Sequence, residues 1–141
     1  MGRSWAWAAT RLGFELVISA PKAYQPPAEF LERLGNGASV SVTEDPVEAA
    51  WNADVLYTDT WVSMGQEADA ARRIQDLTPY QVNAALLAAA PAHAVVMHCL
   101  PAHRGQEITD ELADGERSII FQQAENRLHA QKAILVQLMV D

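Results

Sequence analysis

The sequence alternates short runs of β-branched residues with stretches of helical pattern. The short runs predict strands, which we place at residues 14–20, 39–42, 55–58, 94–98 and 118–121. Strands that alternate with helices pair in parallel through right-handed crossovers. The order of elements therefore predicts an α/β fold with a parallel sheet, and such sheets bind ligands outside the carboxyl ends of their strands.

The predicted helices cover residues 4–12, 28–34, 46–52, 67–77, 78–90 and 124–140. Asp45 is an N-cap before Pro46, and Thr78 opens a capping box. The glycines within residues 35–37 end the second helix. A helix opens the pattern, although in a doubly wound sheet the first helix normally follows a central strand. Either the chain opens with a surface helix or that strand lies upstream, and composition does not choose between the two.

Composition excludes several classes of function. The 141 residues are half hydrophobic, which suits one globular domain with a sizeable core. A formal net charge of −8 argues against binding to nucleic acid, which needs a basic face, and against an anionic membrane surface. A single cysteine excludes an internal disulfide framework. Because Arg11 interrupts the first apolar stretch, we find no targeting signal and expect a cytoplasmic protein.

The first candidate site is the segment 59–65, directly after the strand at 55–58. A carboxylate such as Asp59 can hold an ammonium group, and Ser63 adds a hydroxyl. Gly65 lets a ligand approach the backbone closely. The same residues also fit an N-cap and a turn that leads into the next helix, so both interpretations stay open.

The second candidate is the segment 98–105, which leaves the end of another strand. A metal site would use His98, Cys99 and His103, but paired ligand spacing is missing and we expect no metal. A Cys–His nucleophile is the second interpretation, although a lone cysteine is more often a small buried hydrophobe. In the third, the Cys99 sulfur and nearby backbone carbonyls face a ligand amine. The Leu100–Pro101 bond is a candidate cis peptide, although most X–Pro bonds are trans.

The third candidate is the segment 123–127 at the start of the last predicted helix. Arg127 lies in the first turns, where a helix N-terminus also favours anions, so the two together predict a phosphate or carboxylate site. The alternative is a surface helix on which Arg127 pairs with Glu125 or Glu111. We expect His129 on a helix face. The tryptophans are interpreted as core or interface residues, and they are Trp5, Trp7, Trp51 and Trp61.

These three segments, in this order, resemble one family, ornithine carbamoyltransferase. The resemblance rests on Asp-Thr-Trp-Val-Ser-Met-Gly-Gln-Glu at 59–67, His-Cys-Leu-Pro-Ala-His-Arg-Gly at 98–105 and Gln-Ala-Glu-Asn-Arg at 123–127, and it covers essentially the whole chain. His-Cys-Leu-Pro separates ornithine-type enzymes from aspartate-type relatives, whereas putrescine and N-acetylornithine enzymes share parts of the pattern. The resemblance implies that residues 1–141 form the ornithine-binding C-terminal domain, a Rossmann-like three-layer domain that lacks its first strand. The N-terminal carbamoyl-phosphate domain of the family would be absent.

The resemblance also implies a transferase of arginine biosynthesis or the urea cycle. It would convert carbamoyl phosphate and L-ornithine to L-citrulline and phosphate, with no cofactor. Asp59 and Ser63 would hold the α-amino group, and the backbone of Met64 would meet the carboxylate. Cys99 would lie near the δ-amine, and its backbone and that of Leu100 would line the carbamoyl end.

Arg127 would reach the carbamoyl phosphate, and with Asp59 and Cys99 it completes the expected catalytic set. The phosphate-binding motifs of the family are missing from the sequence, so we expect the chain alone to be inactive. The resemblance also implies that the complete enzyme is a homotrimer. Two other classes of function stay open. One is a non-catalytic α/β module, from a truncated gene product, that binds an amino acid or a partner chain. The other is a Cys–His hydrolase.

Overall fold

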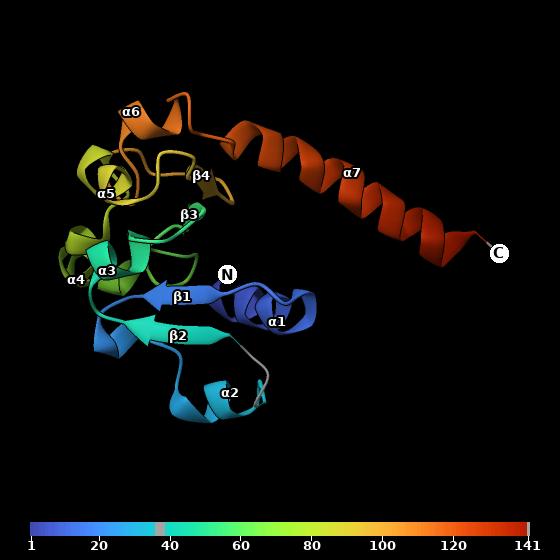
Figure 1. The fold of residues 1–141 in the computed structure, drawn as a ribbon, viewed down its shortest axis with the longest axis horizontal. Coiled ribbons are helices and arrows are strands. Elements are labelled where there is room, and N and C mark those ends of the chain that lie inside the picture. The colour runs from blue at the N-terminus through green and yellow to red at the C-terminus, as the bar shows by residue number, and fades with distance from the viewer. Residues whose placement is uncertain (36–38, 141) are drawn as a thin grey trace.

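The computed structural model describes residues 1–35 and 39–140, so the helix break predicted at 35–37 lies mostly outside the described residues. Strands and helices alternate in the predicted order as far as residue 98 (Figure 1). The helices and strands are α1 (Gly2–Leu12), β1 (Leu16–Ser19), α2 (Ala28–Glu32), β2 (Val40–Thr43), α3 (Pro46–Ala50), β3 (Val55–Thr58), α4 (Ala70–Leu77), α5 (Ala84–Ala89), β4 (Val95–His98), α6 (Asp110–Ala113) and α7 (Ile120–Met139). Short 3₁₀ turns occupy Lys22–Tyr24, Glu67–Asp69 and Thr78–Tyr80.

The strands form two parallel pairs. β1 pairs with β2 in the register Leu16 to Val40, and β3 pairs with β4 in the register Val55 to Val95. Parallel pairing of strands that are separated by helices confirms the predicted α/β class. Among the described residues no strand joins the two pairs, so each pair is a sheet of its own.

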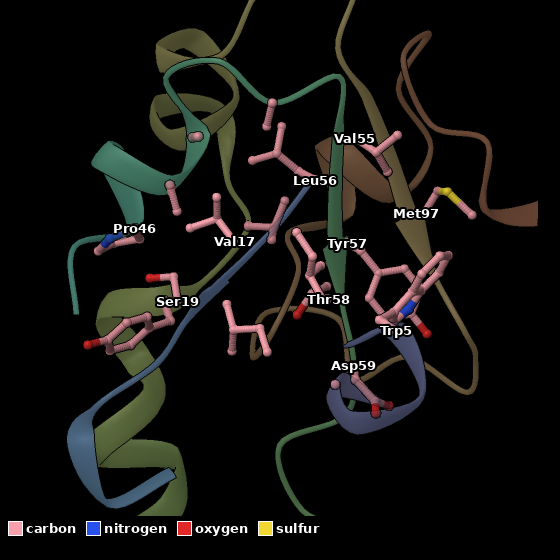
Figure 2. Close-up of a pocket in the computed structure, with 18 of the residues that line it drawn as sticks. Trp5, Val17, Ser19, Pro46, Val55, Leu56, Tyr57, Thr58, Asp59 and Met97 are labelled. Carbon is pink, nitrogen blue, oxygen red and sulfur yellow. The ribbon is translucent and has the colours of Figure 1, made fainter. Parts of the chain in front are cut away.

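A cavity of about 1000 Å³ separates the facing edges of β1 and β3. Figure 2 shows Val17 and Ser19 of β1 on one side of this space, with Leu56 and Thr58 of β3 extending toward it. Such an edge presents backbone N–H and C=O groups without ladder partners. The two half-sheets are therefore held together by the helices and side chains around them.

Helix α1 covers this part of the molecule. Ala6 and Ala9 are almost fully buried, and their small side chains let the helix lie close against its neighbours. Trp5 packs edge-on against Tyr57, with ring centroids 5.0 Å apart, and Gly13 ends the helix in the left-handed conformation with φ 76°. The predicted helix at 4–12 is confirmed and begins two residues earlier.

The main core surrounds β3 and β4. Its buried members come from the helices on either side of these strands and from the segments that follow them; they are Ala50, Leu56, Val82, Leu87, Ala94, Val96, Ile108, Leu112, Ala113 and Ile120. Val96 is fully buried, as expected for a strand covered on both faces. This core fixes the carboxyl ends of β3 and β4.

The single helix predicted over 78–90 is wrong. Thr78 ends α4 instead of capping a new helix, because its Oγ1 donates to the carbonyl of Ile74 (2.7 Å). Val82 then leaves helical geometry to form a parallel bridge with Ile108, and both side chains are buried. The next helix, α5, is capped by Asn83, whose Oδ1 accepts from the Leu86 amide. Burial of Val82 therefore overrides the local capping signal.

The strand predicted at 118–121 is also wrong. Ser118 makes one isolated bridge with Val96, and Ile120 already begins α7. A short apolar run does not distinguish a strand from the buried start of a helix. Helix α6 was not predicted, and Trp51, expected in a core or interface, is 76% exposed.

Helix α7 projects away from the rest of the chain (Figure 1). Ile120 is its buried residue, whereas its second half exposes a run of apolar side chains: Ile134, Leu135, Val136, Leu138 and Met139. Within the described parts of the chain, no helix combines the length and apolarity needed to cross a membrane.

Candidate active site

The ends of β3 and β4 bring the first two candidate segments together. Thr58 lies opposite His98 in the parallel register, so Asp59 and Cys99 leave the sheet side by side. The Cys99 thiol donates a hydrogen bond to Asp59 Oδ1 at 2.9 Å. Two residues that are 40 positions apart in the sequence thus share one location at the carboxyl edge of the sheet, where ligands of such folds bind.

A cavity of about 680 Å³ opens at this edge. Five of the six residues expected to bind substrate line it, namely Asp59, Ser63, Cys99, Leu100 and Arg127. Met1, Trp5 and Asn126 complete part of its wall. Met64 does not line the cavity, and its side chain is 97% exposed, so only its backbone remains a candidate contact.

Asp59 is placed to hold a cation. Its Oδ2 lies 3.2 Å from the N-terminal ammonium of Met1, and its Oδ1 accepts from the Thr60 amide at 2.8 Å. Burial raises the pKa of Asp59, but hydrogen bonds from the Cys99 thiol and the ammonium lower it more, so the pKa falls below its ordinary value. An ionised carboxylate in a half-buried position favours a primary ammonium group as its partner.

The Cys99 thiol has the opposite character from an activated nucleophile. Burial raises its pKa, and the hydrogen bond to Asp59 raises it further. A reactive cysteine needs a lowered pKa, normally from a neighbouring positive charge. The environment of Cys99 therefore argues against the Cys–His hydrolase and favours a sulfur that contacts a ligand.

The loop after β4 turns sharply beneath the cavity. The Leu100–Pro101 peptide is cis, which resolves the alternative that the sequence left open, and Leu100 itself has a φ of 52°. Its amide donates to His98 Nδ1 at 2.8 Å. His103, at the other end of the turn, reaches the first segment through a 2.9 Å hydrogen bond between its Nδ1 and Thr60 Oγ1.

Sequence reasoning missed Glu107, which is fully buried below this turn. Its Oε1 accepts from the His103 amide at 2.5 Å and lies 3.3 Å from His98 Nε2. Locally, Gln106 and Glu107 look like an ordinary polar turn, and no spacing signal distinguishes the buried residue from the exposed ones. Only the fold shows that this carboxylate faces inward.

Arg127 lines the cavity from α7 but not from the helix N-terminus. The helix begins at Ile120, so Arg127 is its eighth residue and lies about 10 Å along the axis from the start. The predicted combination of Arg127 with the helix N-terminus is therefore wrong. Among the described residues Arg127 has no ion pair with Glu125 or Glu111, so the alternative pairing is wrong as well. Gln123 anchors this helix by accepting from the His98 amide at 3.1 Å.

His129 lies on the exposed face of α7, as expected, 3.5 Å from Glu125. The four tryptophans differ in their burial. Trp61 is buried and Trp5 half-buried, whereas Trp7 is exposed. Only Trp5 contributes to the site.

Residues 1–138 match the protein family described as aspartate/ornithine carbamoyltransferase, Asp/Orn binding domain. The chain belongs to this family. It is 54% identical over 129 residues to an ornithine carbamoyltransferase of Methanosarcina mazei, which covers 91% of the chain and 43% of the relative. It is 55% identical over 137 residues to that of Syntrophus aciditrophicus, covering 96% and 45%. The chain thus spans less than half the length of these curated relatives.

Solved structures of carbamoyltransferases share the fold. The ornithine carbamoyltransferase of Pyrococcus furiosus superposes with a TM-score of 0.88 at 44% identity, covering 96% of this chain and 45% of that one. An acetylornithine transcarbamylase complexed with acetylcitrulline superposes with a TM-score of 0.83 at 28% identity, covering 100% and 45%. The same fold thus occurs in an ornithine carbamoyltransferase and in an acetylornithine transcarbamylase.

Proposed function

We propose that the chain forms the ornithine-binding side of an ornithine carbamoyltransferase, which converts carbamoyl phosphate and L-ornithine to L-citrulline and phosphate. One observation carries the proposal: Asp59 and Cys99 meet in a single cavity, which Ser63 and Arg127 also line. Residues 1–141 act as one amine-substrate domain in this proposal, and the carbamoyl-phosphate domain supplies the rest of the site.

We assign the side chains the roles that the resemblance to the family implies. Asp59 and Ser63 hold the α-ammonium group of ornithine, and the Met64 backbone meets its carboxylate. The δ-amine extends toward Cys99 and Leu100, which line the same cavity. Arg127 approaches the carbamoyl phosphate from α7.

The reaction needs a neutral δ-amine that attacks the carbamoyl carbon, with donors for the developing oxyanion and for the departing phosphate. The thiol beside Asp59 suits this step, because a protonated sulfur adds no charge near the attacking amine. Arg127 alone contributes one cationic donor, so the chain by itself lacks the set that the transition state requires.

The proposed preference for L-ornithine rests on its free α-ammonium group. N-acetylornithine carries a neutral amide at that position, and an ionised Asp59 would then lose its cation. Putrescine has no α-carboxylate for the Met64 backbone to meet. Charge complementarity at Asp59 therefore favours L-ornithine over N-acetylornithine, and the contact of the Met64 backbone with the carboxylate favours L-ornithine over putrescine.

For the complete enzyme we propose a homotrimer in the cytoplasm. The single cysteine, which contacts Asp59 and forms no disulfide, supports a reducing compartment.

Titration calorimetry of the chain with L-ornithine, N-acetyl-L-ornithine and putrescine tests the proposal. We expect L-ornithine to bind most tightly and Asp59→Asn to weaken it by about tenfold or more, the size of one hydrogen bond to a charged group. Asp54→Asn is the matched control, because that carboxylate pairs with His93 at the opposite end of β3. Undiminished ornithine binding by Asp59→Asn would overturn the assignment.

A further inference from the structure

The turn after β4 has a backbone that needs support. Among the described residues, Leu100 is the non-glycine residue with a positive φ, 52°. A side chain in the left-handed region costs free energy, and such a residue persists only where its surroundings hold it in place. The groups that hold Leu100 therefore also determine where Cys99 presents its sulfur.

One carboxylate oxygen lies against both ends of this turn, bonding one end and contacting the other. Glu107 Oε1 accepts from the His103 amide at 2.5 Å and lies 3.3 Å from His98 Nε2. The other ring nitrogen of His98 accepts from the Leu100 amide at 2.8 Å. Because Nδ1 accepts, it carries no proton, so the ring proton is on Nε2, which lies 3.3 Å from Glu107 Oε1 without the geometry of a hydrogen bond.

Glu107 is itself fixed to the core. Its carbonyl accepts from the Val82 amide at 2.9 Å, and its neighbour Ile108, fully buried, forms a parallel bridge with Val82. Gln81 Nε2 donates to the carbonyls of Gly105 and Gln106 in the same segment. The side chain of Glu107 thus links a rigid part of the core to the wall of the cavity, although Glu107 does not line that cavity.

We propose that Glu107 is a positioning residue, whose Oε1 fixes the turn between His98 and His103 and so keeps the Cys99 thiol against Asp59. The consequence of this positioning for ornithine binding rests on the proposed function, whereas the positioning itself is a property of the loop. Because His103 also bonds Thr60 on the loop after β3, Glu107 sets the distance between the two ligand-binding loops.

Alkylation of Cys99 by iodoacetamide reports this geometry directly, because the chain has a single cysteine. Three variants separate the effect of side-chain length at position 107 from the effect of its charge. Glu107→Gln keeps an oxygen at the position of Oε1 without the charge, Glu107→Asp keeps the charge but withdraws the oxygen, and Glu107→Ala removes both. We expect the glutamine variant to react within about twofold of the parent, and the other two to react about tenfold faster as Cys99 leaves Asp59.

A matched control excludes general loosening. Leu34→Ala removes buried packing after α2, outside the core against which the turn packs, and it should lower the melting temperature while leaving the alkylation rate unchanged. The proposal is overturned if folded Glu107→Asp alkylates at the parent rate, or if Leu34→Ala accelerates the reaction as much as Glu107→Ala.

A second arm adds L-ornithine and measures protection of Cys99. Protection in the parent and in Glu107→Gln, with loss in Glu107→Asp, supports both proposals. If ornithine protects none of the proteins while the rate differences persist, the positioning role stands and the proposed substrate is wrong.

Discussion

The exposed apolar face of α7 predicts that this chain associates with itself. Leu135, Leu138 and Met139 follow the i, i+3, i+4 spacing of one helix face, and they are 54%, 77% and 77% exposed. Full burial of such a side chain contributes about 1.5–3 kcal/mol, so the exposed fractions leave about 1–2 kcal/mol for each residue. Together they offer about 3–5 kcal/mol to a contact that covers this face.

Replacing the three residues by glutamine tests this estimate. If half of the available free energy is realised after the cost of association, the dissociation constant of the self-associated form rises by about tenfold or more. Glutamine is a good helix former, so the stability of the monomer should change by less than about 0.5 kcal/mol per site. Sedimentation velocity over a range of concentrations measures the first quantity, and urea unfolding measures the second.

The controls define the outcome. Substituting the exposed Gln137, which lies on another face of the same helix, by alanine should leave association unchanged. A triple variant that associates as strongly as the parent chain would show that the chain does not associate through this face of α7. A parent chain that stays monomeric, with a sharp thermal transition at about 45–65 °C, would refute the reasoning altogether.

Three other outcomes are expected. The purified chain should form no measurable citrulline from carbamoyl phosphate and L-ornithine, because it lacks most donors for the transition state, and sustained production would contradict the proposed division of the site. Because the pKa of Asp59 is lowered in the folded chain, its contribution to stability is present above about pH 4 and is lost as pH falls through the lowered value, so Asp59→Asn should flatten the acid side of the stability profile measured by urea unfolding. Asn83→Ala should cost about 1 kcal/mol of unfolding free energy through loss of the α5 cap, and an unchanged urea midpoint would show that this cap is dispensable.

Local signals predicted the elements that depend on local chemistry. Asp45 caps α3 through hydrogen bonds to Val47 and Glu48, and Gly13 ends α1, both as the sequence indicated. The sequence also placed Asp59 and Cys99 at strand ends, and parallel pairing alone was enough to bring them together. These successes rest on signals that act within a few residues or on a general property of parallel sheets.

The misses depend on contacts between distant segments. Val82 leaves the predicted helix because Ile108, 26 positions away, offers it a buried bridge. Glu107 is buried because the loop after β4 folds back over it, and no pattern near residue 107 records that fold. The start of α7 at Ile120 likewise follows from burial against β4, which a short apolar run does not reveal.

The cavity between the two half-sheets also separates two parts of the chain that should tolerate substitutions to different degrees. The cavity beside Asp59 draws its walls from α1, from β4, from the loops after β3 and β4, and from α7, and none of the described residues between 14 and 43 lines it. Substitutions in β1, α2 and β2 should therefore alter solubility or stability while leaving amine recognition intact. In protein engineering this half should tolerate loop grafting and surface redesign. Substitutions in the β3–β4 half should instead change the specificity for the amine.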